Sequence, residues 1–160
     1  MNNKPYLLVS RCLLGEACRY DGKSVSCPAV VQLAKYATLI AVCPESDGGM
    51  PTPRIPSEQL GEKVINQKGE DVTAFFRRGA EIAVEKALEL KIPFAILKER
   101  SPSCGTHQVY DGSFSGQKTD GRGVAAKMLA DAGVVLYSEE EIAEHIPSAL
   151  ARYLGIEEQN

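Results

Sequence analysis

The sequence predicts a single-domain α/β protein. We expect a Rossmann-like three-layer sandwich, with a mostly parallel sheet of about four strands and helices on both faces. Strand and helix patterns alternate four times along the chain, which is typical of parallel sheets with right-handed crossovers. The 160 residues suit one core, so residues 1–160 are predicted to form one domain. With 44% hydrophobic and 24% charged residues, the composition is that of a globular protein.

The first two strands are short apolar runs separated by a helix. Residues 6–10 (YLLVS) and 38–42 (TLIAV) are predicted to be buried strands. Residues 28–37 have apolar positions at helical spacing, and the proline at position 28 is tolerated at a helix start. Residues 44–70 contain several prolines and no usable period, so a long functional loop or lid is expected there.

The next helix and strand follow that loop. Residues 71–90 carry the clearest helical stripe of apolar side chains. Residues 94–97 (FAIL) are predicted to be the third strand, which leads into the segment RSPSCG. Residues 105–121 are expected to be a second long loop without regular structure.

The C-terminal part supplies the fourth strand. A helix near residues 122–132 is followed by a glycine suited to its C-terminal cap, and residues 134–137 form the predicted strand. Ser138 and Glu141 predict a capping box for a last helix, which Pro147 should break or kink. The expected strand order in the sheet is 2-1-3-4.

Charge and hydropathy exclude several functional classes. The net charge of −3 provides no electrostatic footprint for a nucleic-acid polymer or an anionic membrane. No apolar segment approaches the roughly 20 residues needed to span a bilayer, and the first residues lack a signal peptide. We therefore expect a cytoplasmic protein whose partner is a small molecule, and its oligomeric state is left open.

Three of the five cysteines share one position in the predicted fold. Cys12, Cys43 and Cys104 each follow a predicted parallel strand. The carboxyl ends of such strands meet at one edge of the sheet, where open α/β sheets bind ligands. Adjacent strands are roughly 5 Å apart, so the outer two thiols would be about 10 Å apart. Cys18 and Cys27 have no such alignment. An odd number of cysteines without an export signal argues against a disulfide framework.

Three convergent thiolates suit two kinds of metal centre. An iron–sulfur cubane held by three cysteines leaves one iron open for a substrate. Zinc would need a further ligand, which His107 could supply. Three buried cysteines that merely end strands are the alternative, and the repeated strand-end placement disfavours it.

Polar residues beside these cysteines are candidates for chemistry. Glu45 leaves the same strand end as Cys43 and is a candidate proton donor or acceptor. Ser101 and Ser103 could bond to cluster sulfur or to a ligand, although turn stabilisation also accounts for them.

Several further residues are candidates for binding a small planar ligand or an anion. Four of them are expected to contact the substrate: Gly48, Gly49, Arg54 and Gly105. Residues 121–123 (GRG) open a helix and are a weaker candidate for an anion cradle.

Five segments together resemble the DUF523 family, which includes the thiouracil desulfurases. They are SRCLLGEACRYDG (10–22), CPESDGGMPTPRIP (43–56), FFRRGA (75–80), LKERSPSCG (97–105) with YDGSF (110–114), and GRGVA (121–125). The resemblance runs in matching order from near residue 5 to about residue 137.

The resemblance implies a 4Fe-4S cluster held by Cys12, Cys43 and Cys104, the three cysteines that follow strands. It also implies that the fourth iron binds the sulfur of a thiolated base and removes it without net redox change. Glu45 then resembles the acid/base residue of the family. Ser101 and Ser103 resemble its substrate-side hydroxyls, whereas the family does not require a cysteine at position 18.

Three functions stay open on the sequence alone. The first is a cluster-dependent desulfurase for a thiolated pyrimidine or a similar small thioamide. The second is a module that binds zinc or a cluster without catalysis. The third is a metal-free thiol protein that carries persulfide sulfur.

Overall fold

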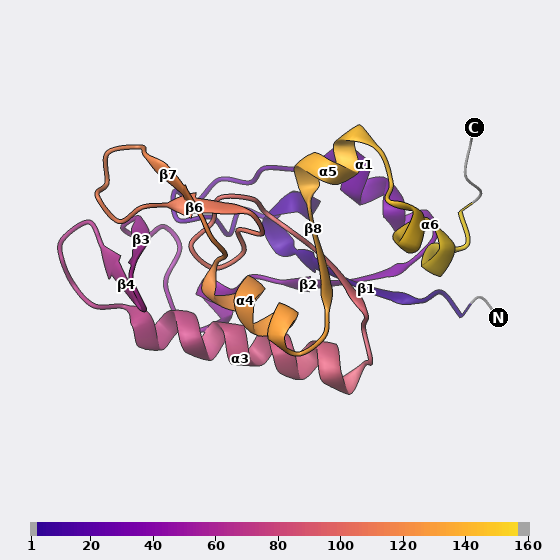
Figure 1. Cartoon of the computed structure of the whole chain (residues 1–160), viewed down its shortest axis with the longest axis horizontal. Helices are drawn as coiled ribbons and strands as arrows, with labels where there is room; N and C mark the ends of the chain where they lie inside the picture. The colour runs from indigo at the N-terminus through magenta and orange to yellow at the C-terminus, as the bar shows by residue number, and fades with distance from the viewer. Residues whose placement is uncertain (1–2, 157–160) are drawn as a thin grey trace.

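The computed structural model describes residues 3–156, and four parallel strands form its central sheet (Figure 1). They are β1 (Tyr6–Ser10), β2 (Thr38–Val42), β5 (Phe94–Leu97) and β8 (Val135–Ser138). Their order is β2-β1-β5-β8, and each neighbouring pair is parallel. Counted along the chain, this is the predicted order 2-1-3-4, so the predicted sheet is confirmed.

Helices cover both faces of the sheet, as predicted. One face packs against α3 (Thr73–Glu89) and α4 (Val124–Asp131), and the other against α1 (Pro28–Val31), α5 (Glu139–Glu144) and α6 (Ser148–Leu154) (Figure 1). Successive side chains of β1 alternate between these faces because strand side chains have a period of two. Leu7 and Val9 join the core under α1, whereas Leu8 joins the core under α3.

The segment 44–70 is not the irregular loop that the sequence predicts. Pro44 occupies the first turn of the short helix α2 (Pro44–Asp47). Strands β3 (Ser57–Leu60) and β4 (Lys63–Asn66) then form an antiparallel hairpin. Each strand has four residues and mixed polarity, which is too short for an alternating pattern to show in the sequence.

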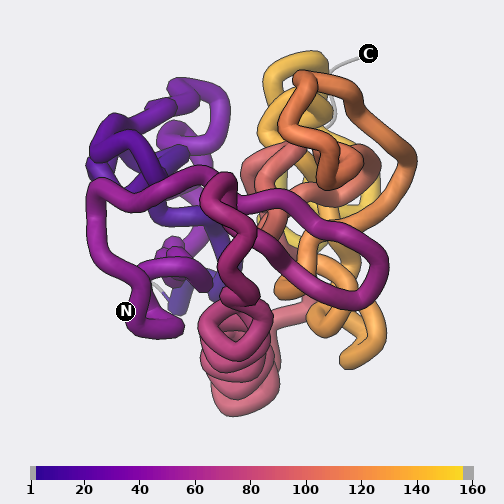
Figure 2. The backbone as a smooth tube through the Cα atoms, turned by 90° about the vertical axis from the view of Figure 1, so that its left-hand side faces the viewer, coloured from indigo at the N-terminus to yellow at the C-terminus, as the bar shows by residue number. Residues whose placement is uncertain are grey.

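The second predicted loop also contains a hairpin. Strands β6 (Gln108–Tyr110) and β7 (Lys118–Asp120) pair antiparallel across residues 111–117. Both hairpins lie at the end of the molecule toward which the sheet strands run, and Figure 2 looks onto this end. They therefore stand over the sheet edge where the sequence predicts the ligand site.

The remaining predicted elements are present, with a difference in the bounds of the first helix. The helix predicted over residues 28–37 ends at Val31 and continues as a 3-10 turn, η2 (Gln32–Lys35). The predicted capping box is confirmed, because the Ser138 and Glu141 side chains each accept a hydrogen bond from the other's backbone N–H. Pro147 separates α5 from α6, as expected. None of the helices in the described range 3–156 is long and apolar enough to cross a bilayer.

Candidate active site

A cavity of about 430 Å³ lies at the carboxyl ends of the strands, and four cysteines line it. Cys12 lies in η1 (Arg11–Leu14), the 3-10 turn that begins directly after β1. Cys43 follows β2 and caps the start of α2. Cys104 lies in the loop after β5. The structure thus brings the three strand-end cysteines to one cavity, and Cys18 is the fourth.

Burial and neighbouring groups raise the pKa of three of the four thiols at this cavity, those of Cys18, Cys43 and Cys104. Burial raises the pKa of Cys104 to about 12, and the Ser103 hydroxyl lies 3.7 Å from its sulfur. The Cys43 thiol donates to the Ser46 hydroxyl at 3.4 Å. A hydrogen bond with Cys18, followed by burial, raises the pKa of Cys43 far above its usual range. Binding a metal at these thiols would therefore release protons, because thiolates are the ligands.

Cys18 enters the site although no strand ends at it. The Cys43 thiol lies 3.7 Å from the Cys18 carbonyl oxygen, and interaction with the Cys12 thiol raises the pKa of Cys18 to about 11. The loop that carries Cys18 folds back because the Arg54 guanidinium donates to the Cys18 carbonyl at 2.9 Å. Cys27, by contrast, packs against the core around α1. The sequence signal for Cys18 is its short spacing after Cys12, across one 3-10 turn.

The arrangement of donors fits a cluster better than one zinc ion. Within residues 3–156, no three His, Cys, Asp or Glu side chains are placed to hold a single metal ion. His107, the predicted nitrogen ligand for zinc, lies outside the cavity with Nδ1 2.9 Å from Glu99 Oε2, so that assignment is wrong. A cubane is wider than one ion, and its thiolates stand correspondingly further apart. Three soft sulfur donors around a roomy cavity match that requirement.

Glu45 points from α2 into the cavity and is held by two partners. Arg54 Nε lies 3.1 Å from its Oε1, and the Ser103 hydroxyl donates to its Oε2 at 3.0 Å. The Arg54 side chain is only 4% exposed. Its remaining donors reach the Pro51 carbonyl and the Thr52 hydroxyl. Arg54, predicted to contact the substrate, is therefore engaged by the protein and fixes Glu45.

Residues 101–105, the SPSCG loop, present a chain of hydroxyls to Glu45. Ser101 Oγ accepts the backbone N–H groups of Ser103 at 3.1 Å and Cys104 at 3.0 Å. It also lies 2.9 Å from Ser103 Oγ. Because Ser103 donates its proton to Glu45, the proton in the Ser101–Ser103 contact belongs to Ser101. Protons can pass along this chain from Ser101 to the carboxylate.

Backbone hydrogen bonds from the start of α4 hold the SPSCG loop in place. The N–H groups of Val124 and Ala125 donate to the carbonyls of Pro102 and Ser103, both at 2.9 Å. These backbone N–H groups at the helix start, which the sequence predicts to bind an anion, are thus used within the protein. The anion cradle predicted at residues 121–123 is therefore wrong. At Gly105, a Cβ would come within 2.6 Å of the Gln108 carbonyl oxygen. A glycine therefore lets two parts of the loop backbone pass close to each other.

Gly48 and Gly49 lie at the end of α2 and outside the cavity lining. A Cβ on Gly48 would collide with the Phe75 carbonyl of α3, and a Cβ on Gly79 would collide with the Pro44 carbonyl. The two helices touch backbone to backbone at these glycines. This contact fixes the position of α2 and hence of Glu45.

Aromatic side chains that the sequence reasoning did not select complete the cavity wall. They are Tyr20, Tyr110 and Phe114. The tyrosines come from the two YDG segments of the chain, and that repeat is the signal that could have identified them. Glu58 of β3 accepts the N–H groups of Gly112 and Phe114, which ties the loop between β6 and β7 to the other hairpin.

Known proteins resemble this chain over nearly its whole length. The model of the 2-thiouracil desulfurase family matches residues 7–141. The uncharacterized protein YbbK of Bacillus subtilis (strain 168) is 39% identical in an alignment 146 residues long, which covers 85% of this chain and 97% of YbbK. A solved structure of TudS, a 4Fe-4S-dependent thiouracil desulfidase, superposes with a TM-score of 0.85 at 42% identity. That match covers 95% of this chain and 99% of TudS.

Proposed function

The chain belongs to the 2-thiouracil desulfurase family, and we propose that it removes sulfur from a thiolated nucleobase or a similar small thioamide. The reaction exchanges C=S for C=O with water and releases sulfide, so no net redox change occurs. One observation carries this proposal. Three strand-end cysteines share a cavity with a carboxylate and two hydroxyls that form a continuous hydrogen-bonded chain.

Cys12, Cys43 and Cys104 would hold a 4Fe-4S cluster and leave one iron without a protein ligand. Such a cluster, when bound, supplies a soft Lewis acid that draws electrons from a thiocarbonyl sulfur. Cys18, which lines the same cavity, is not needed as a ligand in this assignment.

Glu45 is the proposed acid and base. Its carboxylate, oriented by the ion pair with Arg54, can take a proton from the water that attacks the thiocarbonyl carbon. The same carboxyl can return a proton to the departing sulfur. Ser101 and Ser103 would bind the polar edge of the substrate and pass protons to Glu45.

The proposed partner is a small molecule rather than a nucleic-acid polymer, in keeping with a net charge of −3 and an aromatic cavity wall. The five cysteines are free thiols, which suits the reducing cytoplasm as the working compartment.

Anaerobic reconstitution followed by incubation with 2-thiouracil tests the function. The wild-type protein should form uracil and sulfide in equal amounts. Glu45→Gln should lower kcat by about 10²-fold or more, since it removes the general base, and should keep the iron content. Glu16→Gln is the matched control, because Glu16 is an exposed partner of Arg11. Reconstituted wild-type protein that forms no uracil, or Glu45→Gln with wild-type kcat, would contradict the proposal.

A further inference from the structure

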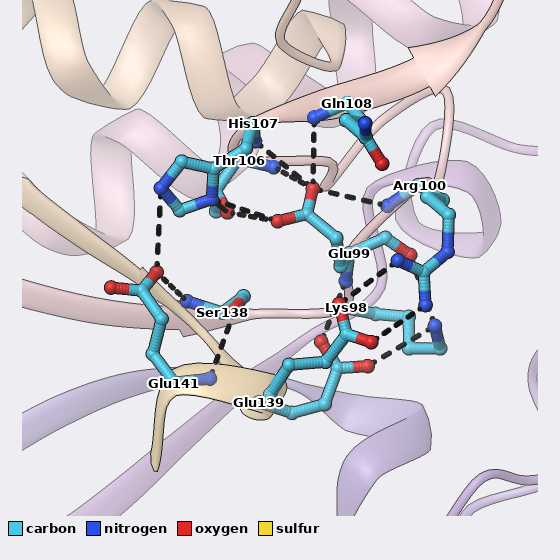
Figure 3. A network of polar contacts seen from close by, with 10 residues as sticks. Lys98, Glu99, Arg100, Thr106, His107, Gln108, Ser138, Glu139 and Glu141 are labelled. Atoms are coloured by element: carbon cyan, nitrogen blue, oxygen red, sulfur yellow. Dashed lines mark hydrogen bonds and ion pairs between the residues drawn. The ribbon is translucent and has the colours of Figure 1, made fainter. Parts of the chain in front are cut away.

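We propose that Glu99 is a positioning residue for desulfuration, which holds Ser101, Ser103 and Cys104 in place by binding both ends of the loop that carries them. The inference rests on the proposed function of this site. Glu99 lies directly after Lys98 at the end of β5, is 4% exposed and forms the centre of the network in Figure 3.

The carboxylate of Glu99 collects donors from two stretches of the same loop. Its Oε1 accepts the backbone N–H of Arg100 at 3.2 Å on the near side. On the far side, Oε1 accepts the N–H groups of Thr106 at 2.8 Å, His107 at 3.0 Å and Gln108 at 3.2 Å. Residues 101–105 lie between these two stretches. One side chain thereby closes the loop into a ring.

The second oxygen binds side chains of the far stretch. Glu99 Oε2 accepts the Thr106 hydroxyl at 2.8 Å and lies 2.9 Å from His107 Nδ1. Because a carboxylate only accepts hydrogen bonds, His107 Nδ1 carries the proton in that contact. Figure 3 shows both oxygens turned toward these donors. Glu99 therefore acts through the loop and does not use its carboxylate on a substrate.

The backbone at the start of the loop needs such support. Arg100 has φ of +67°, in the left-handed region that side chains other than glycine adopt at a cost. The hydrogen bond from its backbone N–H to Glu99 holds it there, whereas a bidentate pair with Glu140, with both distances 2.9 Å, engages only the Arg100 guanidinium. This turn directs Ser101 toward the cavity instead of continuing the line of β5.

Helix α5 supports Glu99 from behind. Glu139 accepts the backbone N–H of Glu99 at 2.8 Å and pairs with Lys98 at 3.1 Å. Glu141 lies 3.5 Å from His107 Nε2. The charged groups around Glu99 are thus Lys98, Arg100, His107, Glu139, Glu140 and Glu141. The capped first turn of α5 holds the acidic partners in register.

Loss of the Glu99 carboxylate would leave four backbone N–H groups and the Thr106 hydroxyl without their acceptor, so the loop must rearrange. A displacement of about 1 Å in a catalytic group can cost about 10²-fold in rate. Glutamine keeps one oxygen for the N–H groups, and its amide can donate to Thr106 and to the other tautomer of His107.

The test compares Glu99→Ala, Glu99→Gln and the control Glu140→Gln in the reconstituted full-length protein. Glu140 is 53% exposed and contacts Arg100 only through its guanidinium. We would measure kcat and KM for 2-thiouracil, amide hydrogen exchange of residues 100–108 and the absorption and EPR spectra of the cluster. Circular dichroism at the assay temperature would test whether each variant is folded.

Glu99→Ala should lower kcat by about 10²-fold, since the loop that carries Ser101, Ser103 and Cys104 shifts, and KM should rise because Ser101 and Ser103 bind the substrate. Its amides at positions 106–108 should exchange at least about tenfold faster, because they lose their acceptor. Glu99→Gln should recover kcat to within about fivefold of wild type, and Glu140→Gln should match wild type.

A folded Glu99→Ala with wild-type kcat, or Glu99→Gln as slow as Glu99→Ala, would overturn the inference. Wild-type protein that forms no uracil would instead refute the proposed function. Hydrogen exchange and the cluster spectra would then test the role of Glu99 without the activity assay. Faster exchange at residues 106–108 with an altered cluster spectrum would support it, and an unchanged loop would overturn it.

Discussion

Among single residues, Glu45 is a part-buried carboxylate whose orientation is fixed by two neighbours. Arg54 lies against one of its oxygens and Ser103 against the other, so the carboxylate is oriented before any substrate arrives. A buried ion pair contributes little stability by itself, but losing one partner leaves the other charge uncompensated. The pair is therefore better understood as a device for orientation than as a source of stability.

The strand-end cysteines were predictable from the sequence because apolar strands and their direction fix where each chain segment leaves the sheet. Cys18 and Tyr110 were not predictable, because contacts between distant segments place them. Arg54 binds the carbonyl of Cys18 across 36 positions of the chain, and Glu58 fixes the loop after Tyr110 across more than 50. No local pattern in the sequence records such contacts.

Glu99 also predicts how stability depends on pH. Burial opposes its ionisation, but hydrogen bonds from His107, Thr106 and Gln108 outweigh burial and lower the pKa of Glu99 from 4.5 to about 2. A carboxyl with a lowered pKa contributes stability above its unfolded pKa, and that contribution is lost as the pH falls through the folded pKa.

The wild-type free energy of unfolding should therefore fall more steeply than that of Glu99→Gln between pH 4.5 and about 2. Urea denaturation of both proteins at several pH values in this window measures the difference. Parallel pH profiles for the two proteins would contradict the assignment. Wild type and Glu99→Gln carry the same set of other titratable groups, so the difference between their pH profiles isolates Glu99.

Among the helices and strands, the contact between α2 and α3 positions the residues of the site. The helices approach at Gly48 and Gly79, and α2 carries both Cys43 at its cap and Glu45 in its first turn. Helix α3 was predictable from its apolar stripe. The one-turn helix α2 and the two hairpins were not, because elements of three or four residues are too short to show a period.

Gly79→Ala should destabilise the protein by about 1–3 kcal/mol, since its Cβ has no room beside the Pro44 backbone. Desulfuration should fall as well, because α2 must move and Glu45 moves with it. Thermal unfolding and kcat measure the two effects. Gly121→Ala is the control, because its Cβ would only touch Val109 at 3.4 Å. Equal behaviour of the two variants would show that α2 is not fixed by this contact.

For the molecule as a whole, the parallel sheet gathers the chemistry at one end. Three strands deliver their following residues to the same edge, and the hairpins β3-β4 and β6-β7 stand over it (Figure 2). The direction of the predicted strands was enough to predict that the ligand site lies at this edge. The closing hairpins and the aromatic wall depend on tertiary contacts, and only the structure reveals them.

Four serine variants test whether Cys12, Cys43 and Cys104 hold the cluster. Iron, acid-labile sulfide and uracil per chain are measured after anaerobic reconstitution and incubation with 2-thiouracil. Cys12→Ser, Cys43→Ser and Cys104→Ser should each lose most of the iron and all turnover, because a ligand of the cluster is missing. Cys18→Ser should keep near-stoichiometric iron and should still form uracil. Three strand-end variants with full iron and full turnover, or a Cys18→Ser variant that alone loses both, would contradict the account.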